Sequence, residues 1–128
     1  MTRIFKNQAF ERFTKKVGIN NESLCKAVKS IESGLCDANL GGGVIKQRIA
    51  RDGQGKSGGF RTLVLFKMET LAFFVHGFAK NEQDNISSSE LKVLKKLATK
   101  MQNYTDVELS IAIGTKLLIE VFCYEQKL

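Results

Sequence analysis

Five basic side chains lie in one short stretch of the sequence, residues 41–61, against a single acid, Asp52. The stretch has a net charge of +4, from five cations and one anion, and it is rich in glycine. Lysine and arginine bind phosphates and stabilise negative charge as it develops on them. The stretch therefore predicts a site for a polyanion, with RNA as the leading candidate. The five cations are Lys46, Arg48, Arg51, Lys56 and Arg61.

Alternation of apolar and polar residues predicts three consecutive strands through and after this stretch. In the first, residues 44–51, Lys46 and Arg48 share one face, and Ile45 and Ile49 share the other. Residues 60–67 form the next expected strand. Residues 71–79 are the most apolar and are expected near the centre of the sheet. The expected connections are a loop at 36–43, a glycine-rich loop at 52–59 and a tight turn at 68–70.

Helical patterns flank these strands. Phe10, Phe13 and Val17 mark the buried face of a helix over residues 7–17, and Asn20 or Asn21 caps a second helix that ends near residue 33. Two capping boxes predict helices over residues 88–104 and from 105 to about 113. Short strands are expected at both ends, an edge strand at residues 2–5 and a last strand at 117–123. Because helices and strands come in runs, we predict an α+β fold with an antiparallel sheet, in a single domain over residues 1–128.

One motif resembles a nucleotide-binding loop but lacks its context. Residues 50–57 fit the permissive form of the phosphate loop, with Ala50 in place of its first glycine. That loop needs a helix directly after its lysine and serine, so that backbone amides and the helix dipole meet the phosphates. Strand sequence follows here instead, so we do not expect a nucleotide site.

Other catalytic groups are sparse. His76 is the single histidine and alternates with Phe74 and Phe78 in the apolar strand, so we expect it to be buried and hydrogen-bonded rather than catalytic. The acidic residues are scattered, and no metal or other cofactor is expected. A nuclease with this sequence would therefore rely on lysine and arginine.

The cysteines and the hydropathy bear on the cellular location. Cys25, Cys36 and Cys123 form an odd, widely spaced set, which argues against both a disulfide framework and a zinc site. Cys25 falls on the apolar face of its helix and is expected to fill the core. No apolar run is long enough to span a membrane, and no signal peptide is apparent. The sequence thus predicts a cytoplasmic protein with reduced thiols.

Two segments resemble a known family. The runs GGGVIKQRIARDGQGKSGGFRTLVLF and FFVHGFAKNEQDNISSSELKVLKKLA are similar to the RelE/ParE superfamily of type II toxins, and closest to its RelE/HigB-like branch. The resemblance implies helices packed on a twisted antiparallel sheet. It also implies an endoribonuclease that cleaves mRNA on the ribosome and inhibits translation. The ribose 2′-hydroxyl attacks the adjacent phosphate and leaves a cyclic phosphate.

The resemblance implies four catalytic residues. Lys46 would act as general base, and Arg61 would stabilise the pentavalent phosphorane. Arg48 would contribute a further phosphate contact. Lys80 would protonate the leaving 5′-oxygen or pair with Glu82. The terminal tyrosine or histidine of many RelE-type toxins has no match here, so the identity of the general acid is open. Three further residues are assigned to RNA: Arg51 and Lys56 through phosphates, and Phe78 by stacking on a base or, alternatively, by packing in the core.

The same resemblance implies partners and leaves alternatives. The partners are the ribosome with its mRNA and a cognate antitoxin, often of helix-turn-helix type, through which the pair binds operator DNA. The antitoxin either covers the cationic face or holds an apolar edge such as residues 117–123. One alternative function is ParE-like inhibition of DNA gyrase, which does not need the cationic cluster. Another is a non-catalytic RNA- or antitoxin-binding protein.

Overall fold

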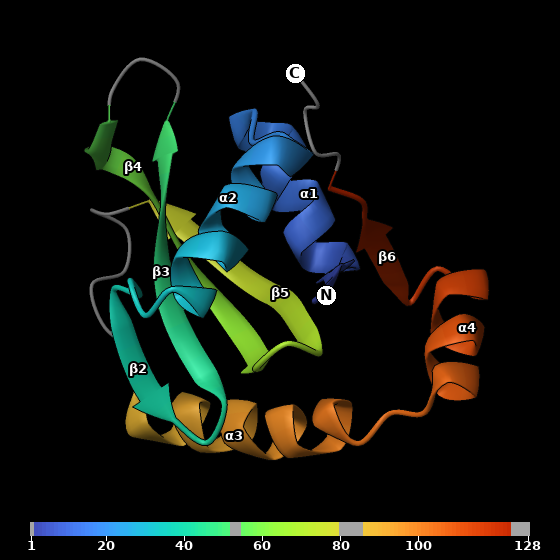
Figure 1. Ribbon diagram of the computed structural model, residues 1–128. Coiled ribbons are helices and arrows are strands. Elements are labelled where there is room, and N and C mark those ends of the chain that lie inside the picture. Colours follow the sequence, from blue (N-terminus) through green and yellow to red (C-terminus); the bar gives the residue numbers. More distant parts are fainter. Residues whose placement is uncertain (1, 52–54, 80–85, 124–128) are drawn as a thin grey trace.

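A single six-stranded sheet carries helices on both faces (Figure 1). The computed structural model describes residues 2–51, 55–79 and 86–123, with only the backbone of residues 51 and 55–58. The strand order is β2-β3-β4-β5-β1-β6, and neighbouring strands are antiparallel except for the parallel pair β1–β5. The predicted α+β class is therefore confirmed. The strands are β1 (Arg3–Asn7), β2 (Ala38–Gly41), β3 (Val44–Arg51), β4 (Gly55–Lys67), β5 (Leu71–Ala79) and β6 (Leu118–Val121).

Four helices lie within the described ranges. Helices α1 (Gln8–Val17) and α2 (Asn21–Glu32) cover one face of the sheet, and α3 (Ser88–Gln102) and α4 (Asp106–Gly114) contribute to the core on the other. Asn7 and Asn20 cap α1 and α2, because their side-chain oxygens accept hydrogen bonds from backbone amides in the first turn. Thr105 and Glu108 form the predicted capping box of α4. The predicted helices are confirmed to within about two residues at each end.

The alternation along β3 is confirmed as well. Ile45 and Ile49 lie in the core beneath α1 and α2, whereas Val44 lies in the core beneath α3 and α4. Residues on one strand alternate between the two faces of a sheet. Lys46 and Arg48 therefore lie on the same side of the sheet as Val44, and this decides where the functional site can be.

Three predictions about strands were wrong. β1 is not an edge strand: it lies between β5 and β6, with Phe5 fully buried. β2 occupies part of the predicted loop 36–43, and β4 begins at Gly55 within the predicted loop 52–59. The sequences of β2 and early β4 are rich in glycine and asparagine, which have low strand propensity, so only pairing with β3 makes them strands. Gly42 and Gly43, both with positive φ, form the turn from β2 to β3.

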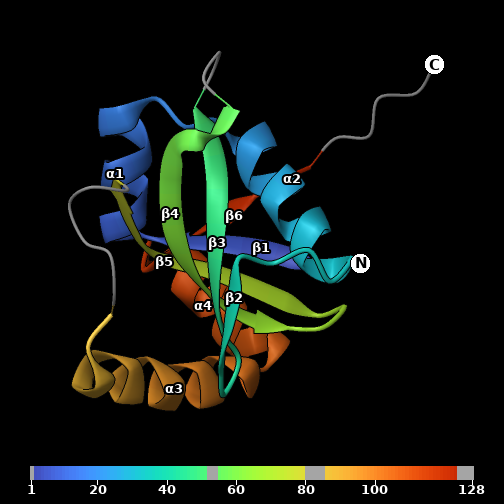
Figure 2. The same cartoon turned by 90° about the vertical axis from the view of Figure 1, so that its left-hand side faces the viewer.

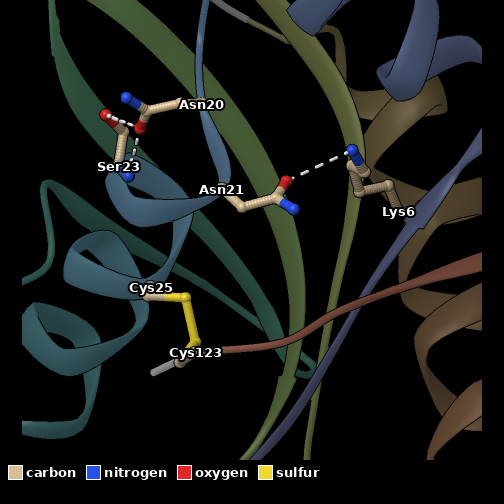
Figure 3. The surroundings of a disulfide bond; sticks show 6 residues. All are labelled: Lys6, Asn20, Asn21, Ser23, Cys25 and Cys123. Atoms are coloured by element: carbon tan, nitrogen blue, oxygen red, sulfur yellow. Dashed lines mark hydrogen bonds between the residues drawn. A yellow bond between two sulfur atoms is a disulfide. The ribbon is translucent and has the colours of Figure 1, made fainter. Parts of the chain in front are cut away.

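A buried ion pair ties β1 to α1. Lys6 Nζ donates a hydrogen bond of 2.7 Å to Glu11 Oε1, and it lies 3.5 Å from Asn21 Oδ1, a contact that Figure 3 shows. The Lys6 side chain is only 7% exposed and that of Glu11 20%. The hydrogen bond from the ammonium lowers the pKa of Glu11 below its ordinary value of 4.5, although burial opposes the shift.

We expect Glu11→Gln to reduce the free energy of unfolding by about 2 kcal/mol at neutral pH, because a buried cation loses its charged partner. The folded-state pKa is lowered, so the stabilisation is complete above pH 4.5 and is lost as pH falls through the folded-state pKa. Urea unfolding from pH 7 to pH 3 should show the difference between wild type and variant shrinking below about pH 4.5. Glu22→Gln is the matched control, since Glu22 pairs with Lys26 on the exposed surface. An equal loss in both variants, or a difference independent of pH, would contradict this account.

A disulfide corrects the prediction of three free thiols. Cys25 of α2 bonds to Cys123, two residues after β6, and Figure 3 shows the bridge. Cys25 does lie in the core as predicted, but as a disulfide partner, and Cys36 is the free cysteine among the described residues. The two bonded cysteines are 98 residues apart, so their spacing in sequence gives no hint of the pairing. They meet in the folded chain because α2 packs on one face of the sheet and β6 is an edge strand of the same sheet.

No helix within the described ranges is long and apolar enough to cross a membrane.

Candidate functional site

Three of the predicted cations lie on the same face of two paired strands. Arg48 of β3 is directly opposite Arg61 of β4, and Lys46 is opposite Leu63. Directly paired residues of an antiparallel sheet project from the same face, so the three basic side chains gather there. Figure 2 shows α3 crossing the end of the sheet where β3 begins, while β3 continues past it. Lys46 and Arg48 follow Val44 along β3, on the part of the face that leads away from α3.

A carboxylate that the sequence analysis did not single out lies at the centre of these cations. Asp37 Oδ1 is 3.0 Å from Arg48 Nε, and Asp37 Oδ2 is 3.7 Å from Arg61 Nε and 3.9 Å from Lys46 Nζ. We call these four residues the Asp37 cluster. The side chains of Asp37 and Arg61 are only 16% and 14% exposed, so water screens their charges incompletely. One anion among three cations leaves the cluster with a net charge of +2.

Gln47 fixes the position of Asp37 from the other face of β3. The Asp37 backbone N–H donates a 3.1 Å hydrogen bond to Gln47 Oε1, and Gln47 Nε2 donates a weaker one to the carbonyl oxygen of Leu35. Gln47 is 3% exposed, so breaking these bonds would leave buried polar groups without partners. The segment before β2 is thereby held against β3, which places the Asp37 carboxylate beside the basic side chains.

One arginine of the cluster has a donor without an acceptor in the described part of the chain. Arg48 Nε is excluded from solvent and has no hydrogen-bond acceptor in the described part of the chain. Its 3.0 Å contact with Asp37 is therefore an ion pair without hydrogen-bond alignment. A guanidinium carries five N–H donors in a fork that matches phosphate oxygens. The cluster thus combines a net charge of +2 with one unsatisfied guanidinium donor, and both features suit an anionic ligand.

A β-bulge changes the expected roles of His76 and Phe78. β5 pairs Phe74 with Val64 but His76 with Leu63, so one extra residue enters β5 between them. His76 and Phe78 are consequently shifted onto the face of the Asp37 cluster, with Phe78 opposite Arg61. His76 is exposed, so the prediction that it is buried was wrong. Phe78 is only 5% exposed and lies in the core, which favours packing over base stacking.

The remaining predicted site residues are only partly described. Lys80 lies outside the described residues, and for Arg51 and Lys56 only the backbone in β3 and β4 is described. The structure thus brings together Lys46, Arg48 and Arg61, with His76 and Phe78 on the same face. Within the described ranges, no group of three or more histidine, cysteine or acidic residues is arranged to hold a metal.

The fold and the cluster define a class of protein: a small α+β domain with a cationic face on its central hairpin. A family model described as the RelE toxin of the RelE/RelB toxin–antitoxin system matches residues 2–121, and the chain belongs to this family. The match extends beyond the two segments that resemble the family and includes α4 and β6. The family's name implies an antitoxin partner of the RelB type. A search of the curated proteins found no match.

Proposed function

We propose that this RelE-family toxin is an endoribonuclease that cleaves mRNA on the ribosome without a metal ion. The observation that carries the proposal is the Asp37 cluster. It brings two arginines and a lysine to one face of the hairpin with a net charge of +2, and Arg48 Nε has no hydrogen-bond acceptor there. Three convergent cations suit a reaction whose transition state places extra negative charge on a phosphate.

In the proposed reaction, the ribose 2′-oxygen bonds to the adjacent phosphorus and the bond to the 5′-oxygen of the next nucleotide breaks. The products are a 2′,3′-cyclic phosphate and a 5′-hydroxyl, with water taking no part in this step. Lys46 must act through its neutral amine, which accepts the 2′-hydroxyl proton and becomes cationic as negative charge develops on the phosphate, and Arg61 stabilises the phosphorane oxygens. Arg48 binds the same phosphate or the next one, and Arg51 and Lys56 would bind phosphates further along the RNA.

The leaving 5′-oxygen needs a proton, and two residues are candidates to supply it. Lys80 was predicted from the family resemblance. His76 is added by the bulge, which places an exposed imidazole diagonally across from Arg61. A histidine can donate and accept protons near neutral pH.

We expect His76→Gln to slow single-turnover cleavage by about 10²-fold with little change in RNA affinity, since general acid catalysis contributes roughly that much. Lys80→Ala in the same assay tests the rival donor. Cleavage by His76→Gln at the wild-type rate would exclude the imidazole, and a slow Lys80→Ala variant would then assign the role to Lys80.

The proposed function is tested by inducible expression with and without a co-expressed antitoxin, followed by mapping of mRNA 5′ ends. Growth arrest with new 5′-hydroxyl ends inside translated codons would support mRNA cleavage. Arrest with intact mRNA and a DNA-damage response would instead indicate the gyrase-directed activity. A folded protein that binds RNA but causes no arrest would be a binding module, and the proposal would fail.

A further inference from the structure

We propose that Asp37 is a positioning residue that occupies the place of an RNA phosphate in the free toxin and holds the catalytic cations in their working arrangement. This inference rests on the proposed function of the cluster. It adds a residue that touches no reacting atom yet controls both how tightly RNA binds and how fast it is cleaved.

The first support is geometric. Both carboxylate oxygens of Asp37 are used: one faces Arg48 and the other lies between Arg61 and Lys46. Each arginine contacts Asp37 through Nε, the guanidinium nitrogen that is bonded to the aliphatic part of the side chain. A carboxylate that bridges groups from β3 and β4 in this way fixes their spacing, just as a bound phosphate oxygen would.

The second support is electrostatic. Without Asp37, three cations would lie close together on a poorly screened surface, and their mutual repulsion would drive the long side chains apart. The attraction of one carboxylate opposes this repulsion. The contacts are nevertheless weak individually, at 3.0–3.9 Å and without aligned hydrogen bonds, so an incoming phosphate can replace them.

The third support is the way the backbone carries Asp37. Its N–H is held by buried Gln47, which also holds the carbonyl of Leu35, so the carboxylate belongs to a fixed segment and not to a free loop. The hydrogen-bonded backbone keeps Asp37 beside the cluster in the free toxin, so the arginines are already spaced when a phosphate displaces the carboxylate.

These features predict effects of opposite sign on binding and on turnover. Asp37→Asn removes the competing anion, so RNA should bind more tightly. The same change removes the group that spaces the arginines, so the bound phosphate should be held less accurately and cleaved more slowly. A residue that merely supports the fold would weaken binding and cleavage together.

The test compares Asp37→Asn with wild type and with Glu69→Gln, which loses the same charge in the exposed turn between β4 and β5. Binding is measured by fluorescence anisotropy with a single-stranded RNA that carries a 2′-deoxy group at the scissile nucleotide and cannot be cleaved. Cleavage is measured in single-turnover reactions on ribosomes programmed with mRNA. The arrangement of Arg48 and Arg61 is followed through the NMR signals of their Nε–H groups, which need neither RNA nor ribosome.

For Asp37→Asn we expect RNA affinity to rise about 3–10-fold. The slope of log affinity against log salt concentration should become more negative by about 0.7, because one more cation is available to neutralise a phosphate of the single strand. The cleavage rate should fall about 10–100-fold, in line with a misplaced reacting group. The Nε–H signals of both arginines should shift or broaden. Glu69→Gln should match wild type in all three measurements.

Weaker or unchanged RNA binding by Asp37→Asn, or unchanged arginine signals, would overturn the inference. A faster cleavage rate would also overturn it, since Asp37 would then be only an inhibitor. If wild type binds RNA but never cleaves it, the proposed function fails, while the binding and NMR measurements still decide the role of Asp37.

Discussion

Replacing both Lys46 and Arg61 with alanine is expected to abolish growth arrest and to slow mRNA cleavage by about 10³–10⁴-fold. Removing one group that stabilises developing charge typically slows a reaction by about 10²–10³-fold. The effects of removing two groups that act together are less than the product of the single effects. Arg61 is 14% exposed and shares Asp37 with Lys46, so both losses fall within one poorly solvated cluster. The measurement is the single-turnover rate on programmed ribosomes, together with colony formation under induction.

The matched control removes two cations far from the site. Lys26 and Lys29 lie exposed on α2, over the opposite face of the sheet, so Lys26→Ala plus Lys29→Ala makes the same change in net charge. This control should retain arrest and cleavage. Full toxicity of the Lys46/Arg61 double variant would contradict the assigned site and would favour the gyrase-directed function, which does not need the cluster.

Removing the disulfide, by Cys25→Ala plus Cys123→Ala, is expected to lower the free energy of unfolding by about 3 kcal/mol. A cross-link that closes a loop of roughly 100 residues reduces the freedom of the unfolded chain by up to about 4.7 kcal/mol in the chain-entropy model, and measured values are usually smaller. The bridge joins α2 to the residues that follow β6, which is an edge strand of only four residues. The midpoint of urea unfolding, measured with and without reductant, reports the effect.

Reductant should destabilise wild type and leave the double variant unchanged. Cys36→Ala should behave like wild type, because Cys36 lies outside the disulfide. Thiol titration of the unfolded, unreduced protein should find one free thiol per chain. Finding three, or a wild type that reductant does not affect, would show that the bond is absent under those conditions.

The sequence alone determined the elements that are encoded by residues close together in the chain. β3 and β5 have their predicted bounds, because alternation along a strand directly reflects its two faces. The caps of α2 and α4 follow from polar residues next to apolar helical patterns. The placement of Lys46 and Arg48 on one face, and the family itself, were likewise available from residues close together in the chain.

Tertiary structure alone decided the features that depend on contacts between distant segments. Asp37 meets the cations because β2 pairs with β3, and the propensities of the β2 residues do not predict that strand. The bulge in β5 moves His76 to the opposite face of the sheet, because one extra residue reverses the facing of every later side chain in the strand. No residue in β5 predicts the bulge from the sequence. Cys25 and Cys123 become neighbours across 98 residues for the same reason. Local sequence encodes period and caps, whereas the partners of a strand or a charge are set by which segments pack together, and only the folded chain contains that information.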